Sequence, residues 1–273
     1  MRARAQPRWG QHFLIDPNVA LAIVEWADVG GQDVVEIGPG RGALTGMLAQ
    51  RARSLTLIEI DPKLATNVRD EYVNAAHVRV IEADALRVNW REVAPVPFRV
   101  VANLPYESGT AIVRRLIEHG SSLTQAVVML QREVCQRMTA TEGSKLYGVL
   151  SVHMTLNADV SLGRIVGPSS FRPRPQVESQ LLRIRPLTAP RWAHGSPEHF
   201  AEVVRVAFSE RRKMLRNTLG RWLTQRIGAA SADRVLADAG VVPTQRPETV
   251  STQAFAQIAA RSYELIHCDA RAS

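Results

Sequence analysis

Residues 34–42 read Val-Val-Glu-Ile-Gly-Pro-Gly-Arg-Gly, so a short run of β-forming residues passes directly into a glycine-rich loop. A helical pattern of apolar residues follows at Ala43–Gln50. Doubly wound α/β folds bind a cofactor at this turn, where the first strand leads into the first helix. Glycine suits such a turn because it has no β-carbon to keep a ligand away from the backbone. We therefore interpret residues 38–42 as a cofactor loop, with a purely structural tight turn as the alternative.

The N-terminal two thirds of the chain continue the alternation of strand and helix. Predicted strands are Val34–Ile37, Leu55–Ile60, Val78–Glu82, Phe98–Ala102 and Ala126–Leu130. Helical spacing recurs at Ala43–Gln50, Pro62–Tyr72, Thr110–His119 and Arg132–Thr139. This alternation is typical of βαβ units around a parallel sheet. The sequence predicts an α/β fold with a doubly wound, mostly parallel, Rossmann-like sheet.

The remaining patterns divide the chain in two. Val149–Leu156 and Val177–Ile184 are predicted to be two strands that close the sheet as an antiparallel edge pair. Prolines and a glycine mark residues 186–197 as a linker. Helices are predicted at Glu198–Trp222, Ser231–Ala239 and Thr252–His267. We expect a catalytic domain at residues 1–187 and a small helical domain at residues 188–273.

Two carboxylates follow the predicted strands. Glu59 ends the second strand 21 residues after Gly38, where it can accept hydrogen bonds from both hydroxyls of a ribose. Asp84 ends the third strand and can accept one from an adenine amine. Solvated surface acids are the alternative for each. A nicotinamide cofactor would call for GxGxxG spacing, whereas Gly38, Gly40 and Gly42 are spaced by two. The spacing favours S-adenosylmethionine over nicotinamide, and makes a dehydrogenase a distant alternative.

The fourth strand ends in Asn103-Leu104-Pro105-Tyr106, at the same edge of the sheet. The amine on adenine C6 is a poor nucleophile because its lone pair is delocalised, so attack on a methyl group needs a more tetrahedral nitrogen. The Asn103 side-chain oxygen and the Leu104 carbonyl can accept its two hydrogens, and Pro105 adds no donor. Tyr106 offers a stacking face to the base. An ordinary turn with a core tyrosine is the alternative.

With these motifs the chain resembles the ribosomal RNA adenine dimethylase family, which includes small-subunit dimethyladenosine transferases and macrolide-resistance methylases of large-subunit RNA. The resemblance covers nearly the whole chain. Its motifs are Gly10-Gln11-His12-Phe13-Leu14, Glu36-Ile37-Gly38-Pro39-Gly40, Glu59-Ile60-Asp61, Asn103-Leu104-Pro105-Tyr106, residues 171–179 and residues 208–213. It implies a class I methyltransferase that transfers two methyl groups from S-adenosylmethionine to N6 of each target adenine.

The resemblance also implies site residues. Those that would hold S-adenosylmethionine are His12, Leu14, Gly38, Gly40, Glu59, Asp84 and Asn103. Among them, His12 and Leu14 would line the methionine end. Asn103, Leu104 and Tyr106 would act on the adenine, with Phe171 as a second stacking surface opposite Tyr106 and a core phenylalanine as the alternative for Phe171.

Within the family, Leu104, residues 131–148 and residues 209–213 are similar to the small-subunit branch. We therefore expect dimethylation of 16S rRNA during ribosome maturation. Alternatives are a macrolide-resistance methylase of one 23S rRNA adenine and an RNA-binding assembly factor without catalysis. The chain departs from the family at His12, where asparagine is usual, and at Glu107-Ser108-Gly109, where an Asn-Ile-Ser-like run is usual.

Charge supports an RNA partner. The 273 residues carry a formal charge of +8, and residues 191–273 contain 12 basic and eight acidic side chains. A helix over Glu198–Trp222 would place Arg205, Arg212 and Arg216 on one face for RNA phosphates, with a solvated face as the alternative. Arg2, Arg4 and Arg8 would be a second contact.

Composition excludes several classes of protein. The two cysteines form no CxxC pair and have no nearby histidine pair, so the sequence predicts no metal site. No segment is apolar for ~20 residues, and no signal peptide is evident. We expect a cytoplasmic monomer that acts on an assembling small subunit and not at a membrane.

Overall fold

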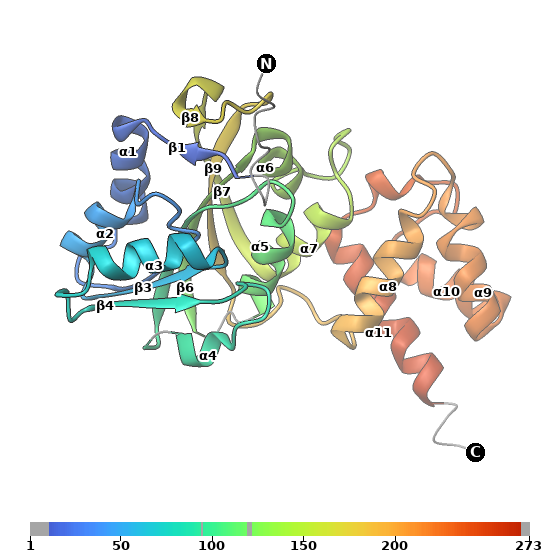
Figure 1. The fold of residues 1–273 in the computed structure, drawn as a ribbon. Coiled ribbons are helices and arrows are strands. Elements are labelled where there is room, and N and C mark those ends of the chain that lie inside the picture. The colour runs from blue at the N-terminus through green and yellow to red at the C-terminus, as the bar shows by residue number, and fades with distance from the viewer. Residues whose placement is uncertain (1–10, 94, 119–121, 269–273) are drawn as a thin grey trace. The chain divides into compact units, whose positions relative to one another are not determined.

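The computed structural model describes residues 11–93, 95–118 and 122–268. The chain forms two compact units (Figure 1). Unit 1 comprises residues 1–135 and 159–188, and unit 2 comprises residues 136–158 and 189–273. The predicted contacts of Arg2, Arg4 and Arg8 lie outside the described residues.

Unit 1 is built on a seven-stranded sheet with the order β4-β3-β2-β5-β6-β9-β7. The strands are β2 (Asp33–Ile37), β3 (Ser54–Glu59), β4 (Val78–Glu82), β5 (Phe98–Asn103), β6 (Leu123–Gln131), β7 (Ala158–Val166) and β9 (Ser179–Pro186). The first five are parallel, and β9 pairs with β6 in the antiparallel direction. The predicted parallel sheet with an antiparallel strand at Val177–Ile184 is confirmed.

Helices cover both faces of this sheet. They are α1 (Pro17–Ala27), α2 (Thr45–Arg51), α3 (Pro62–Glu71), α4 (Trp90–Val93), α5 (Gly109–Glu118) and α6 (Arg132–Met138). Met129 of β6 packs in one buried cluster with α1, whereas the next residue, Leu130, lies against Gly109 of α5. Successive strand residues point to opposite faces, so α1 and α5 lie on opposite sides of β6.

A two-stranded antiparallel ribbon, β1 (Phe13–Leu14) and β8 (Phe171–Arg172), adds to unit 1. A short 3₁₀ helix, η1 (Pro168–Ser170), leads into β8. Phe13 is paired with Arg172 and Leu14 with Phe171. The ribbon therefore joins the N-terminal segment to a segment more than 150 residues later.

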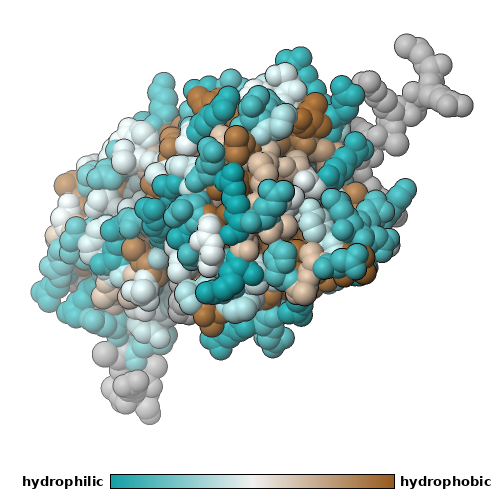
Figure 2. Space-filling model, turned by 90° about the vertical axis from the view of Figure 1, so that its left-hand side faces the viewer, coloured by the Kyte–Doolittle hydropathy of each residue, from teal (hydrophilic) through white to brown (hydrophobic). Residues whose placement is uncertain are grey.

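Hydrophilic residues cover most of the left-hand side of Figure 1, with hydrophobic ones scattered among them (Figure 2).

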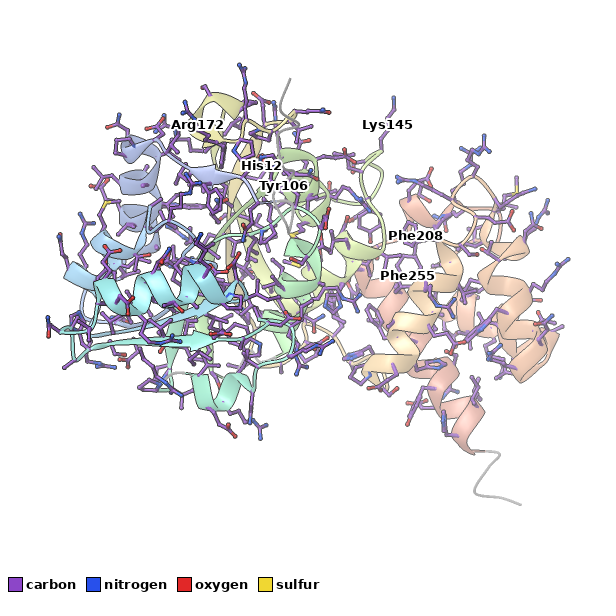
Figure 3. The ribbon with its side chains drawn as sticks, in the orientation of Figure 1. His12, Tyr106, Lys145, Arg172, Phe208 and Phe255 are labelled. Atoms are coloured by element: carbon purple, nitrogen blue, oxygen red, sulfur yellow. The ribbon has the colours of Figure 1, made fainter. Side chains whose placement is uncertain are left out.

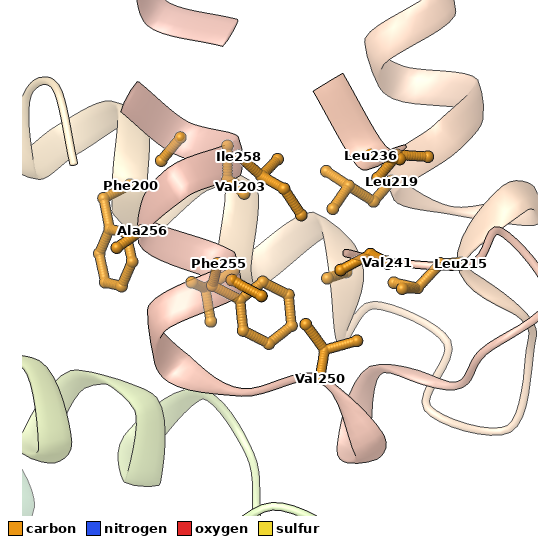
Figure 4. Close-up of a cluster of buried hydrophobic side chains, with 14 of the residues drawn as sticks. Phe200, Val203, Leu215, Leu219, Leu236, Val241, Val250, Phe255, Ala256 and Ile258 are labelled. Atoms are coloured by element: carbon orange, nitrogen blue, oxygen red, sulfur yellow. The ribbon is translucent and has the colours of Figure 1, made fainter. Parts of the chain in front are cut away.

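Unit 2 is helical. It contains α7 (Val149–Asn157), α8 (Pro197–Ala207), α9 (Leu219–Ile227), α10 (Ala229–Asp238) and α11 (Thr252–Cys268), with 3₁₀ helices η2 (Leu215–Asn217) and η3 (Pro247–Thr249). Apolar side chains from these elements form one buried cluster around Phe255 (Figure 4). Within the described ranges, no helix is long and apolar enough to cross a membrane.

One predicted strand in this part of the chain is wrong. Val149–Leu156 was predicted to be a strand and is the helix α7, because Val152 and Leu156 lie one turn apart and pack into the core of unit 2. For the same reason residues 136–158 group with unit 2, whereas the later change of unit, after residue 188, lies one residue from the boundary expected after residue 187.

The single helix predicted at Glu198–Trp222 is also wrong. It is interrupted after Ala207 and resumes at Leu219. Between the two helices the amides of Leu215 and Arg216 bond to the carbonyls of Gln245 and Pro243, at 2.8 and 2.9 Å. These bonds to a later loop replace the helical ones.

Candidate active site

One pocket in unit 1 lies at the carboxyl ends of the parallel strands, where α/β folds bind their ligands. It is formed by the loop after β2, the ends of β3, β4 and β5, and the N-terminal segment around β1. The predicted site residues in its lining are His12, Leu14, Gly38, Gly40, Glu59, Asp84, Asn103, Leu104 and Tyr106. The structure thus brings together residues that are separated by more than 90 positions in the sequence.

The glycine loop has a backbone that favours glycine. Gly38, Gly40 and Gly42 have φ angles of +67°, +58° and +80°, which side chains rarely tolerate. At Gly40 a β-carbon would also lie 3.1 Å from the ring of Phe13. At Gly38 no atom outside residues 37–39 lies within 4 Å of the position a β-carbon would take. The backbone at Gly38 is therefore open to close approach by a ligand.

Glu59 holds the ligand-facing loops in place. Its side chain is buried, and its Oε2 accepts a hydrogen bond from the Gly40 amide at 3.0 Å. Its Oε1 accepts bonds from the amides of Ile60 and Asp61, both at 3.0 Å. A carboxylate has about four acceptor sites. The backbone uses three of them, which leaves about one for a ligand hydroxyl.

Asp84 is the more exposed of the two predicted carboxylates. Its Oδ1 accepts a hydrogen bond from the Leu86 amide at 2.9 Å, and its Oδ2 lies 3.8 Å from Nε of Arg87. The side chain keeps 32% of its surface exposed. It is therefore held by its own turn and remains accessible from the pocket.

The side chain of Asn103 is oriented by the N-terminal segment. Its Nδ2 donates a hydrogen bond to the His12 carbonyl at 3.1 Å. Because a carbonyl only accepts, the amide nitrogen faces His12, and Oδ1 remains free to accept a hydrogen bond. The His12 ring in turn donates from Nδ1 to the Pro173 carbonyl at 2.7 Å, and it lies 5.2 Å from the Tyr106 ring (Figure 3).

The rest of the tetrapeptide is fixed by backbone and side-chain bonds. The Leu104 amide donates to the Met129 carbonyl at 3.1 Å. The Tyr106 hydroxyl is hydrogen-bonded to the Ser179 hydroxyl at 2.8 Å. Burial raises the pKa of Tyr106, so its ring stays uncharged at neutral pH. Tyr106 therefore presents a neutral aromatic face held from its far end.

The unusual Gly109 has a packing explanation. A β-carbon there would lie 2.4 Å from Cδ2 of Leu130 and 3.3 Å from Cβ of Leu104. Leu130 occupies the space that a serine side chain would need. The departure from the family pattern at this position is thus matched by the packing of β6 against α5.

Phe171 is the one predicted catalytic residue that the structure does not bring into the pocket lining. Its side chain is 3% exposed and packs in the buried cluster with Leu14, its partner in the β1–β8 ribbon. In this conformation Phe171 is a core phenylalanine, the alternative considered for it, because a buried ring has no free face for a base. Its stacking role stays a prediction.

The arginines predicted to bind RNA do not form a stripe on one helix. Arg205 lies in α8, Arg212 in the following turn and Arg216 in η2. All three are exposed. The premise of a single helical face is wrong, because the chain turns between residues 208 and 218. RNA binding by these side chains remains a prediction.

Three residues that the sequence motifs contain, but to which the sequence analysis gave no role, take part in the site or support it. Glu36 is buried and lines the pocket, and its Oε2 has no hydrogen-bond partner among the described residues. Burial, together with the nearby charge of Glu59, raises the pKa of Glu36 to about 8. The Phe13 ring lies beside Gly40, and the Ser179 hydroxyl is hydrogen-bonded to the Tyr106 hydroxyl. The acid inside an otherwise apolar strand, Val-Val-Glu-Ile, was a signal for Glu36.

We expect the substitution Glu36→Gln to change how stability depends on pH. Glu36 loses its proton near pH 4.5 in the unfolded chain and near pH 8 in the folded chain. Between these values the folded state binds more protons, so its contribution to the free energy of unfolding falls as pH rises. The glutamine variant lacks this fall. Urea unfolding should be measured at pH 5, 6, 7 and 8. The free energy of unfolding of the variant should rise relative to that of the unaltered protein as the pH approaches 8.

The matched control is Glu82→Gln, which removes an exposed carboxyl at the end of β4, two strands away from Glu36 in the same sheet. It should follow the unaltered protein at every pH. If the free energies of unfolding of Glu36→Gln and the unaltered protein differed by the same amount at every pH in this range, the folded state would not retain the Glu36 proton.

Comparisons with known proteins cover most of the chain. Residues 2–257 match the family model described as ribosomal RNA adenine dimethylase. A protein of Magnetococcus marinus named ribosomal RNA small subunit methyltransferase A is 38% identical over 256 residues, which are 92% of this chain and 90% of that protein. A protein of the same name in Leptothrix cholodnii is 42% identical over 230 residues, 83% of each chain.

Two solved structures resemble the whole fold. A dimethyladenosine transferase from Plasmodium falciparum has a TM-score of 0.77 at 24% identity, covering 90% of this chain and 96% of that one. The 23S rRNA methyltransferase ErmE has a TM-score of 0.67 at 27% identity, covering 91% and 98%.

Proposed function

Because the chain belongs to the ribosomal RNA adenine dimethylase family, we propose that it transfers methyl groups from S-adenosylmethionine to N6 of adenines in small-subunit (16S) rRNA. Two methyl groups go to each target adenine, and the substrate is an assembling small subunit. The observation that carries the proposal is the pocket itself, which combines an open glycine backbone, two carboxylates and the Asn103–Tyr106 tetrapeptide.

The pocket fits the proposed cofactor. The open position at Gly38 accommodates close approach to the backbone, and the unpartnered Oε2 of Glu36 offers a polar group to a ligand. Glu59 would accept from the ribose and Asp84 from the adenine amine, while His12 and Leu14 would line the methionine end. When bound, S-adenosylmethionine supplies an electrophilic methyl group on a positively charged sulfur.

The protein's own contribution is to prepare the target amine. Asn103 Oδ1 and the Leu104 carbonyl accept the two hydrogens of the adenine N6, which draws that nitrogen toward a tetrahedral geometry and exposes its lone pair. Pro105 has no amide hydrogen to compete for these acceptors. The Tyr106 ring stacks on the base and holds it in plane, an interaction worth ~1 to 3 kcal/mol. The amine is thereby made nucleophilic without a general base, and its proton leaves to solvent after transfer.

The test is methyl transfer from labelled S-adenosylmethionine to undermethylated small ribosomal subunits and, separately, to large-subunit RNA. Label on small-subunit adenines supports the proposal. Label only on large-subunit RNA would support the second candidate, a 23S rRNA methylase, which the similarity to ErmE favours. RNA binding without transfer to either would leave an assembly factor. We expect the protein to act as a cytoplasmic monomer.

A further inference from the structure

Two arginines flank the aromatic ring at one side of the pocket. Phe13 lines the pocket, and the guanidinium carbon of Arg41 lies 4.6 Å from the centre of its ring. Arg172 is paired directly opposite Phe13 in the β1–β8 ribbon. Residues directly opposite one another in an antiparallel pair project to the same face. Arg41 and Arg172 therefore stand on the same side of the ribbon as the Phe13 ring.

A third arginine follows on a stiff segment. Residues 171–175 read Phe-Arg-Pro-Arg-Pro, so Arg172 and Arg174 alternate with prolines, which restrict the backbone. The carbonyl of Pro173, between the two arginines, accepts the hydrogen bond from the His12 ring at 2.7 Å. Since that ring also contacts Tyr106, the segment is tied to the tetrapeptide that would hold the target base (Figure 3). We call Arg41, Arg172 and Arg174 the basic rim.

The charges of the basic rim are available to a ligand. All three side chains belong to exposed residues, and none of them forms an ion pair with any residue in the described ranges. Nearby Arg132, in contrast, is paired with Glu178 at 2.6 Å. Arg41 lies in the pocket lining, and Arg172 and Arg174 lie on the segment joined to the lining residues Phe13 and His12. Three guanidinium groups without an ion pair in the described ranges favour an anion with several charges along its length.

We propose that the basic rim binds the RNA phosphates on either side of the target adenosine. The inference rests on the proposed function: a base turned out into the pocket brings its own backbone to the pocket's edge. Guanidinium groups suit phosphate oxygens, and such contacts position a nucleic acid without reading its sequence. Unit 1 then contributes to RNA binding directly, through Arg172 and Arg174, which do not line the pocket, and through Arg41, which belongs to the glycine loop.

The experiment compares the double variant Arg172→Gln/Arg174→Gln with the unaltered protein. The Kd for undermethylated small subunits is measured by filter binding over a range of salt concentrations. Each arginine contact to a phosphate that is lost should weaken binding by about fivefold near 0.15 M salt. It should also lower the slope of log Kd against log salt concentration by about one. Arg41→Gln should do the same singly. Arg172→Lys/Arg174→Lys, which keeps the charge, should restore most of the affinity. Neither double variant should change the KM for S-adenosylmethionine, because Arg172 and Arg174 do not line the pocket.

The control is Arg91→Gln, an exposed arginine of α4 at the opposite, amino-terminal edge of the sheet. It removes one positive charge, as each single substitution in the rim does, and should leave the salt slope unchanged. Equal slopes for the double variant and Arg91→Gln would overturn the proposal, as would a change confined to the KM for S-adenosylmethionine. Because binding is measured without turnover, failure of the rim is distinguished from failure of methyl transfer, which the labelling assay tests by itself.

Discussion

Asn103→Ala is expected to lower kcat for methyl transfer to small-subunit adenines by about 10²- to 10³-fold, the usual cost of removing one oriented polar group that acts in a transition state. The alanine removes the side-chain acceptor that we propose for the amine and leaves the Leu104 carbonyl alone. The bond from Nδ2 to the His12 carbonyl fixes Oδ1 in the accepting orientation, so no reorganisation is needed before reaction. The measurement is single-turnover label transfer with saturating subunits.

The matched control for this variant is Asn74→Ala, an exposed asparagine of the same unit. It should retain full activity. The Kd of Asn103→Ala for S-adenosylmethionine, measured by calorimetry, should change far less than kcat. If transfer by Asn103→Ala stayed within threefold of the unaltered protein, the side chain would not be the acceptor, and the activation of the amine would have to come from elsewhere.

The central sheet and its cofactor loop are predictable because their signals are local. Strands β2 to β6 begin and end within a few residues of the predicted bounds, since each is a short run rich in apolar residues between polar turns. The three glycines fall where the backbone takes positive φ values. The predicted Rossmann-like class I methyltransferase fold is confirmed by the sheet order and by the similarity to solved methyltransferases.

Unit 2 was harder to predict because distant segments decide its local structure. Val149 and Val152 are β-branched and favour a strand, yet Val152 is held in a helix by partners some 50 to 100 residues later. Likewise, the apolar spacing of Phe200, Val204 and Leu215 continues across the break after α8. Periodicity alone cannot locate a turn that is fixed by bonds to residues 243–245.

The residues of the candidate site also fall into those that local sequence signals predict and those that depend on distant contacts. Glycines and acids at the ends of strands were found because the topology of a parallel sheet gathers them at one edge. The hydrogen bonds from Asn103 to His12 and from Tyr106 to Ser179 join segments 91 and 73 residues apart. No spacing in the sequence encodes them. Phe171 was predicted from its motif to face the base, but the motif does not reveal that the ring in β8 points toward the core.

Gly38→Ala is expected to weaken binding of S-adenosylmethionine by about 10- to 100-fold, as when one methyl group overfills a fitted site. The added carbon would occupy open space at the pocket wall, where no atom outside residues 37–39 lies within 4 Å. The same substitution forces alanine to a φ of +67°, which costs about 1 kcal/mol of folding stability. Binding is measured by calorimetry and stability by urea unfolding.

Gly240→Ala separates these two effects. Gly240 has a φ of +68° and, like Gly38, open space at its β-carbon position, but it belongs to unit 2. Alanine there should lower the free energy of unfolding by a similar amount and leave cofactor affinity unchanged. Equal losses of affinity in the two variants would mean that backbone strain, and not contact with the ligand, accounts for the glycine at position 38. A loss confined to Gly38→Ala would show that the ligand approaches the backbone there, as the open loop predicts.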